Sequence, residues 1–230
     1  MKKTLLLVLI LVSTITAFSQ INGNYNYSVA IKGYSLMQMP KIFNETSSDK
    51  FTDAYFNGVM VKFNDNQISY RLSGTFYSKP KEFFNDCESC AEANGKLVDY
   101  SFKIGFEKNF NYSRIQPYFA FDIGYRYNRF KGILENRNEL KARLTEAKDQ
   151  SVEYSKNGFL ASPVIGVKIN PITMLSIFVE GNLDFFYSFE KQKTVFSDID
   201  NTRLIINDRE SEFLLNPVSI GIQVHLGNNK

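Results

Sequence analysis

Tryptophan is absent from this 230-residue sequence, histidine occurs once and cysteine occurs twice. His225 is therefore the only histidine available as a base for nucleophilic chemistry. The two cysteines stand in C-E-S-C at Cys87 and Cys90, and no second cysteine pair or nearby histidine completes a zinc site. These shortages leave few residues on which metal or histidine-based chemistry could be built, so no cofactor is expected.

A strong charge imbalance is also missing. The formal net charge is +3, and Lys2 and Lys3 supply two of the positive charges. Without the first 19 residues, 25 basic residues face 24 acidic ones. This balance gives no electrostatic reason to expect nucleic acid as a partner. The mean hydropathy is slightly negative, which excludes a bundle of membrane helices.

The N-terminus has the pattern of a secretory signal. Lys2 and Lys3 precede an apolar run from Leu5 to Ala17, and Ala17-Phe18-Ser19 fits a cleavage site before Gln20. The run is too short for a membrane anchor helix and lacks a stop-transfer flank. We therefore predict a signal peptide over residues 1–19 and a single exported domain over residues 20–230.

Export decides how the two cysteines are interpreted. In an oxidising compartment, a disulfide between Cys87 and Cys90 that staples a loop is the favoured interpretation. Thiol exchange is the alternative, but it needs a thioredoxin-like βαβ context that the sequence does not show.

The mature sequence is organised around one stretch, Lys96 to Tyr127. In its first arm, every second residue from Val98 to Phe106 is apolar, and in its second arm the same holds from Pro117 to Tyr127. A period of two is typical of β-strands with two unlike faces. A polar turn between Lys108 and Arg114 joins the arms. The pattern predicts an antiparallel hairpin whose arms are long enough to cross a bilayer.

The same alternation recurs along the chain and predicts eight strands. They cover Tyr25–Leu36, Tyr55–Phe63, Ile68–Phe76, Val98–Glu107, Pro117–Asn128, Ala161–Ile169, Leu175–Ser188 and Val218–Leu226. Long connections follow the first, third, fifth and seventh strands, and short ones follow the others. This is the arrangement of an outer-membrane barrel with periplasmic termini, short periplasmic turns and longer outer loops.

The long connections are the least regular part of the sequence. Ser78–Asn94 carries both cysteines, while Gly132–Lys156 and Glu190–Ser211 are polar and charged. Within the second of these, Glu139 and Arg143 stand four residues apart, as do Leu140 and Leu144. This spacing predicts a short amphipathic helix from Glu135 to Gln150. In the third, Asp198, Asp200 and Asn201 have calcium-like spacing but lack the glycine and terminal glutamate of an EF-hand loop.

Alternation alone does not separate a membrane barrel from a soluble one that holds its apolar residues inside. Size favours the membrane barrel, because the interior of an eight-stranded barrel is only wide enough for side chains. The bulky face therefore fits better outside, with the small and charged face inside. Aromatic residues also gather near both strand ends, as in the two aromatic girdles of membrane barrels.

This orientation directs many charged residues into the lumen. Buried charges must be paired and hydrogen-bonded, so we expect a network of ion pairs that fills the lumen. Its predicted members are Lys32, Lys62, Arg71, Asp99, Lys103, Glu107, Asp122, Arg126, Lys168, Glu180 and Asp184. On the central hairpin, Lys103, Asp122 and Arg126 are expected to meet one another inside the barrel.

With its signal peptide, eight alternating strands and repeats such as F-K-I-G-F-E and F-A-F-D-I-G-Y, the sequence resembles the outer-membrane β-barrel domain family of small OmpX/OmpA-like barrels. The likeness covers the mature chain and is one of pattern. It departs at the C-terminus, where V-H-L-G-N-N-K lacks the terminal aromatic residue of such barrels. The resemblance implies an all-β, eight-stranded, up-and-down transmembrane barrel in the outer membrane of a Gram-negative-type envelope. Outer-membrane lipid and the barrel-assembly machinery are its implied partners.

The function that we predict is non-enzymatic: a structural role, or a surface interaction through the outer loops with a ligand that the sequence does not identify. Two alternatives are open. A lipid-modifying barrel enzyme of similar size would need a histidine near the outer rim, whereas His225 falls near the periplasmic rim. A narrow pore would need a lumen that the predicted ion pairs leave open.

Overall fold

The computed structural model describes residues 25–43, 51–65, 68–84, 91–136, 150–195 and 202–228. Eight strands form one closed barrel in chain order. They are β1 (Tyr25–Gln38), β2 (Phe51–Asp65), β3 (Ile68–Phe84), β4 (Ala91–Asn109), β5 (Ile115–Asn136), β6 (Gln150–Ile172), β7 (Leu175–Val195) and β8 (Arg203–Asn228). No helix among these residues is long and apolar enough to span a membrane.

Every strand pairs antiparallel with its neighbours in the sequence, and β1 closes the ring by pairing with β8. At the closing seam, Ser28 lies opposite His225 and Val29 opposite Val224. The predicted all-β, up-and-down barrel of eight antiparallel strands is thus confirmed, including its weakly patterned first strand.

The alternation in the sequence separates the two faces of the wall. On the hairpin from which the prediction began, Phe102, Ile104 and Ile123 are about half exposed on the outside, whereas Asp122 and Arg126 are buried inside. A ring of large apolar side chains that points away from the protein is stable in lipid, because lipid tails solvate it. The outer face of the barrel therefore meets the bilayer.

The strands are longer than the sequence indicated. Much of the predicted loop Ser78–Asn94 belongs to β3 and β4, and much of Glu190–Ser211 belongs to β7 and β8. The bounds of the predicted helix are wrong, because Glu135 and Asn136 end β5 and Gln150 begins β6. Charged residues on both faces of these extensions hide the period of two. The barrel therefore continues well beyond its apolar band as a sheet.

Several predictions fall outside the described residues. They are the signal peptide over residues 1–19, the Cys87–Cys90 disulfide, the interior of the predicted helix and the Asp198, Asp200 and Asn201 group.

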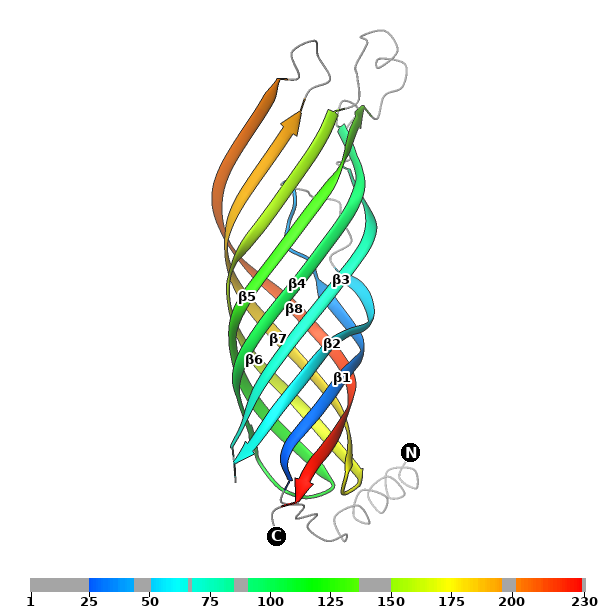
Figure 1. Ribbon diagram of the computed structural model, residues 1–230, viewed down its shortest axis with the longest axis vertical. Helices are drawn as coiled ribbons and strands as arrows, with labels where there is room; N and C mark the ends of the chain where they lie inside the picture. The colour runs from blue at the N-terminus through cyan, green and yellow to red at the C-terminus, as the bar shows by residue number, and fades with distance from the viewer. Residues whose placement is uncertain are drawn as a thin grey trace, which may run out of the picture.

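The first two strands, β1 with 14 residues and β2 with 15, are the shortest, and their early end divides the barrel into an inner and an outer half. In Figure 1, β1 and β2 end near mid-height while β3 to β8 continue upward. β2 pairs with β3 only between Gly58↔Thr75 and Asp65↔Ile68, and β1 pairs with β8 only as far as Val218. The β1–β2 pairing ends at Gln38↔Phe51, and above it, within the described residues, the facing edges of β3 and β8 have no strand between them.

The chain that follows β1 enters this gap. The Gln38 amide N–H donates to the Asn216 side chain (3.2 Å), and the Leu215 amide N–H donates to the Gln38 side chain (2.9 Å). The Lys41 amide N–H donates to Glu212 (3.0 Å), and Ile42 is almost fully buried. Side chains and backbone of residues 38–43 thus line the upper edge of β8 where no strand pairs with it.

Candidate functional site

The lower part of the lumen is organised around one carboxylate, Glu107 on β4. Its oxygens pair with the Lys62 ammonium at 2.5 Å, the Lys168 ammonium at 2.6 Å and the Arg71 guanidinium at 3.4 Å. All four side chains are buried. Three cations from β2, β3 and β6 around one anion join strands from opposite sides of the barrel.

A second group lies above it and shares Arg71. The Arg71 guanidinium contacts Glu180 at 3.2 Å and Asp122 at 3.2 Å, and the Lys32 ammonium reaches Glu180 at 2.8 Å. The Tyr118 hydroxyl donates to Glu180 at 2.9 Å. Arg71 therefore holds three carboxylates in place, counting Glu107, which makes it the centre of the network.

Two further pairs complete the set. The Lys103 ammonium binds Asp184 at 2.6 Å, and Arg126 donates to Asp99 at 2.8 Å. All eleven residues of the predicted lumen network thus face the interior and form ion pairs there. Lys103, Asp122 and Arg126 lie around one cavity inside the barrel, but their ion pairs are with other residues. Each binds a partner on another strand.

That cavity has a volume of about 40 Å³. It lies between the Arg71–Glu180 pair and the Lys103–Asp184 and Arg126–Asp99 pairs. A water molecule needs roughly 10–15 Å³ of such space, so the cavity has room for a few waters at most. Its lining is polar and charged, from Lys32 and Arg71 to Asp184 and Asn216. The lumen at this level is a packed polar core, as expected for eight strands.

Large aromatic rings brace the same region. The Tyr118 ring lies across Gly166 of the next strand, where an added Cβ atom would clash with the ring. The Phe178 ring covers Gly221 in the same way. Both rings are almost completely buried. Glycine at the opposite position is what lets each ring lie flat against the inner wall.

The only histidine closes the periplasmic end. Asn64 donates to the Ser28 hydroxyl (3.0 Å), which contacts His225 Nδ1 (2.9 Å). On the other side, His225 Nε2 contacts the Ser176 hydroxyl (2.6 Å), which donates to the Asn170 side-chain oxygen (2.5 Å). Because Ser176 gives its proton to Asn170, Nε2 must be the donor in the contact with Ser176. His225 therefore cannot act here as a base toward Ser176, and among the described residues no acidic side chain hydrogen-bonds to its ring.

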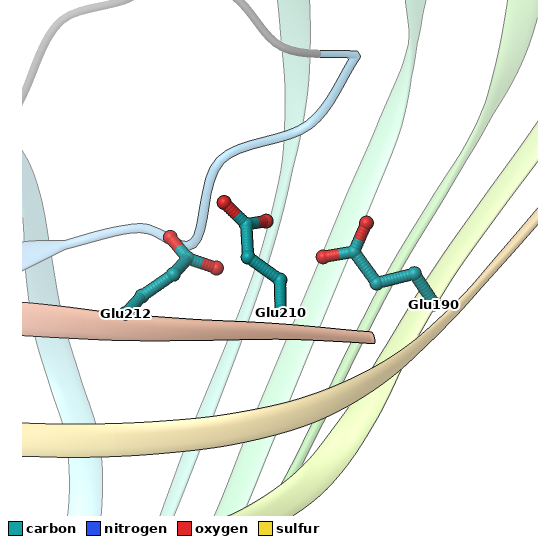
Figure 2. A group of neighbouring side chains, drawn as sticks. All are labelled: Glu190, Glu210 and Glu212. Carbon is teal, nitrogen blue, oxygen red and sulfur yellow. The ribbon is translucent and has the colours of Figure 1, made fainter. Parts of the chain in front are cut away.

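The outer half contains a second charge cluster that the sequence patterns missed. Glu190 of β7 and Glu210 and Glu212 of β8 extend toward the chain that follows β1, with carboxylate oxygens within 4.8 Å of one another (Figure 2). The buried ammonium of Lys156 pairs with Glu190 at 2.6 Å, with Glu210 at 2.7 Å and with Glu212. It also donates to the Lys41 carbonyl at 3.0 Å. Continued alternation from Val152 through Tyr154 to Lys156 was the available sequence signal.

Three clustered carboxylates resemble a metal-binding site, but a lysine ammonium occupies the centre of this cluster. The Lys156 ammonium contacts all three carboxylates and supplies the positive charge that a cation would bring. The cluster lies above the aromatic residues that mark the outer end of the apolar band, outside the membrane-spanning segments. Burial raises the pKa of Glu190. For Lys156, burial lowers the pKa, but the field of Glu212 and the hydrogen bonds to the three glutamates outweigh it, so the net shift is upward. The charged ammonium is thereby favoured.

An apolar core fills the outer mouth beside this cluster. It joins residues of six strands, β1 to β6, to Ile42 and Phe43 of the chain after β1, and its buried members include Tyr77, Phe83, Leu97, Phe130, Val152 and Tyr154. The Phe43 ring packs edge-on against Phe83, Phe130 and Tyr154. Phe43 adopts a positive φ of 59°, which an L-residue tolerates only where packing holds it. The segment after β1 thus plugs the mouth.

No protein-family model matches the sequence, and no curated protein matches it. Solved structures do match. The outer membrane protein OprG from Pseudomonas aeruginosa aligns over 90% of this chain and 100% of its own, with a TM-score of 0.56 and 7% identity. The chain has the fold of the small outer-membrane β-barrels. A major outer membrane protein from Thermus thermophilus aligns over 87% of this chain and 99% of its own, with a TM-score of 0.51 and 11% identity.

Proposed function

We propose that this protein is a non-enzymatic outer-membrane barrel that presents a strand edge above the membrane for binding an extended segment of another protein. One observation carries the proposal: the inner half is sealed, whereas among the described residues the outer half of β8 has a strand partner on one side only. The fold shared with outer-membrane proteins supports the location.

The sealed lumen argues against transport through the barrel. Ion pairs from Glu107 to Asp184 and the Tyr118 and Phe178 rings occupy its cross-section, and the cavity between them has only about 40 Å³. The hydrogen bonds of His225 argue against catalysis, because both ring nitrogens are held by serines that serve other acceptors or donors. What the barrel offers its surroundings is its outer surface.

The two free edges in the outer half differ in chemistry. On β3, the edge carries Lys79, Pro80 and Lys81, and proline and lysine are the residues that natural sheets use to block pairing. On β8, the edge carries Leu204, Ile205 and Ile206, all about half exposed. Apart from the contacts of residues 38–41 with residues 212–216, no described residue covers it. An unpaired edge rich in β-branched residues favours addition of a strand.

A second copy of the protein is a poor occupant of this edge. Copies inserted in one membrane share their orientation, so two β8 strands related by an axis along the membrane normal are both tilted and cross at roughly 80°. Crossed strands cannot form a ladder of backbone hydrogen bonds. An extended peptide segment of an external protein has no such restriction.

Peptide selection tests the binding role. The protein in lipid nanodiscs is panned against a phage-displayed random peptide library, beside Ile205→Lys/Asn207→Lys, which places lysines on the free edge, and Ser155→Lys, which places one on the paired strand β6. We expect wild type and Ser155→Lys to select the same β-branched peptides, and the edge variant to lose them. Peptides that bind all three proteins equally would contradict the proposal.

Planar-bilayer recording tests the sealed lumen. We expect no sustained single-channel openings from purified protein, because the ion pairs and rings leave no continuous path. Reproducible, ion-selective openings that survive removal of the outer strand extensions would show that the protein is a pore.

A further inference from the structure

The outward face of the barrel carries a group of basic residues just above its outer aromatic ring. We call Lys96 of β4, Arg129 and Lys131 of β5, and Lys191 and Lys193 of β7 the basic belt. Their positions follow from the same alternation that turns Tyr100, Tyr127 and Tyr187 outward. Lys96, Lys131 and Lys191 are exposed.

Without a bound anion, the basic belt contains two like charges in an energetically unfavourable position. The register places Lys96 directly opposite Lys131. Like charges in directly opposed positions destabilise a sheet. Glu153, between Lys131 and Lys193 in the register, pairs with Arg129 at 2.5 Å. Across the part of the chain that the structure describes, none of the four lysines of the belt has an ion-pair partner. An anion that bridges Lys96 and Lys131 would remove the repulsion.

The height of the basic belt indicates where that anion is. A tilted strand rises about 2.5 Å per residue along the barrel axis. Tyr127 and Tyr187 each stand 12 residues above the first residue of their strands, or about 30 Å. This is the level at which aromatic girdles mark the end of the apolar band. Lys131 and Lys191 stand four residues further along, or about 10 Å higher, and Lys96, which the register places opposite Lys131, lies at a similar height.

Head groups of the outer leaflet occupy this layer. Lysine is a flexible cation that binds phosphate as a point charge, and its apolar stem can lie along the aromatic rings below. The stacked pair of Tyr100 and Tyr127, with ring centroids 5.0 Å apart, supplies such a surface directly beneath Lys96 and Lys131. The outward acids near the belt include Glu153, which pairs with Arg129, Glu92, which accepts a hydrogen bond from Asn94, and Glu82 of β3, which the register places opposite Asn94.

We propose that the basic belt binds the phosphate groups of outer-leaflet lipid head groups on the β4–β7 side of the barrel. This inference depends on the membrane placement of the barrel and not on strand addition at β8. It assigns the bound lipid to one side of the barrel, because β1 and β2 end below this level.

Lipid titration followed by native mass spectrometry tests the proposal. Detergent-solubilised protein is titrated with lipid A that carries two phosphates and with the same lipid after dephosphorylation. Wild type is compared with Lys96→Gln/Lys131→Gln and with Lys108→Gln/Arg114→Gln, which removes the same charge from the periplasmic end of the same hairpin. A mobility shift on boiling verifies that each variant is folded.

We expect wild type and the periplasmic variant to bind the phosphorylated lipid alike, and the belt variant to bind it roughly ten- to thirty-fold more weakly. Dephosphorylation should weaken binding by wild type to a similar extent and should hardly affect the belt variant. Equal binding of both lipids by wild type, or an equal loss in both double variants, would overturn the proposal. Failure of peptide selection at the β8 edge would leave this result untouched.

Discussion

The inner and outer halves of this barrel share strands β3 to β8, but the inner half lies in lipid and the outer half in water. The inner half has a polar core and an apolar surface, with Arg71, Glu107 and Glu180 inside and Ile104 and Ile123 outside. The outer half has an apolar core around Phe130 and an outer face that carries lysines. The inversion follows the solvent, since lipid stabilises apolar surface and water stabilises charge. Each half can be disturbed separately.

The largest effect is expected at the centre of the inner half. Replacing Arg71 by Leu leaves Glu107, Glu180 and Asp122 buried without their shared cation, which should cost about 3–5 kcal/mol. Urea titration in detergent, read as the loss of the gel-mobility shift, measures the free energy of unfolding. Arg209→Leu, which removes an exposed guanidinium of the outer half, should change it by less than about 1 kcal/mol. Similar losses in both variants would argue against a supporting network in the inner half.

The next contrast compares two isoleucines that are about equally exposed but lie in different surroundings. Ile104 is 47% exposed and Ile205 is 51% exposed, but Ile104 lies in the middle of the apolar band and Ile205 far above it. Arginine at Ile104 should destabilise the folded barrel in lipid by about 2–4 kcal/mol, and at Ile205 by almost nothing. Unfolding in phospholipid vesicles measures both. Equal costs would contradict the placement of the membrane.

The charge cluster of the outer half should respond to loss of its cation. In Lys156→Ala, the carboxylates of Glu190, Glu210 and Glu212 lose the ammonium between them and repel one another, which should weaken the outer half by roughly 1–3 kcal/mol. Calcium ions should recover part of this loss in the variant and have no effect on wild type, because three carboxylates suit a hard cation. Amide hydrogen exchange of β7 and β8 with and without calcium measures both. Calcium protection of wild type would disprove the role assigned to Lys156.

The smallest effect on the stability of the whole barrel is expected at the plug. Phe43→Ala removes a ring that contacts Phe83, Phe130 and Tyr154 and should cost about 1–3 kcal/mol locally. Hydrogen exchange in residues 37–43 and in the upper part of β8 should rise, while the unfolding midpoint of the whole barrel should not change. A lowered midpoint would show that the two halves unfold together.

Local patterns in the sequence were enough to establish the barrel and the inner half of its lumen. Strict alternation from Val98 to Phe106 indicated the strands, and a narrow lumen required that Lys62 and Glu107 find partners inside. Sequence reasoning placed His225 at the periplasmic rim for the same reason. These inferences succeed because a period of two and the cost of burying an unpaired charge are both local properties of the sequence.

The outer half, in contrast, depends on contacts between residues far apart in the chain. The stagger between strands places Asp184 beside Lys103 and Asp99 beside Arg126. From the sequence pattern alone, Lys103 and Arg126 had been grouped with Asp122. The early end of β1 and β2 created the gap, and packing in that gap drew Ile42 and Phe43 inside. Charged residues in the extensions weaken the alternation, so the strands beyond Ser188 were missed. The partners of Lys156 lie on β7 and β8 and could be recognised only once those strands were in place.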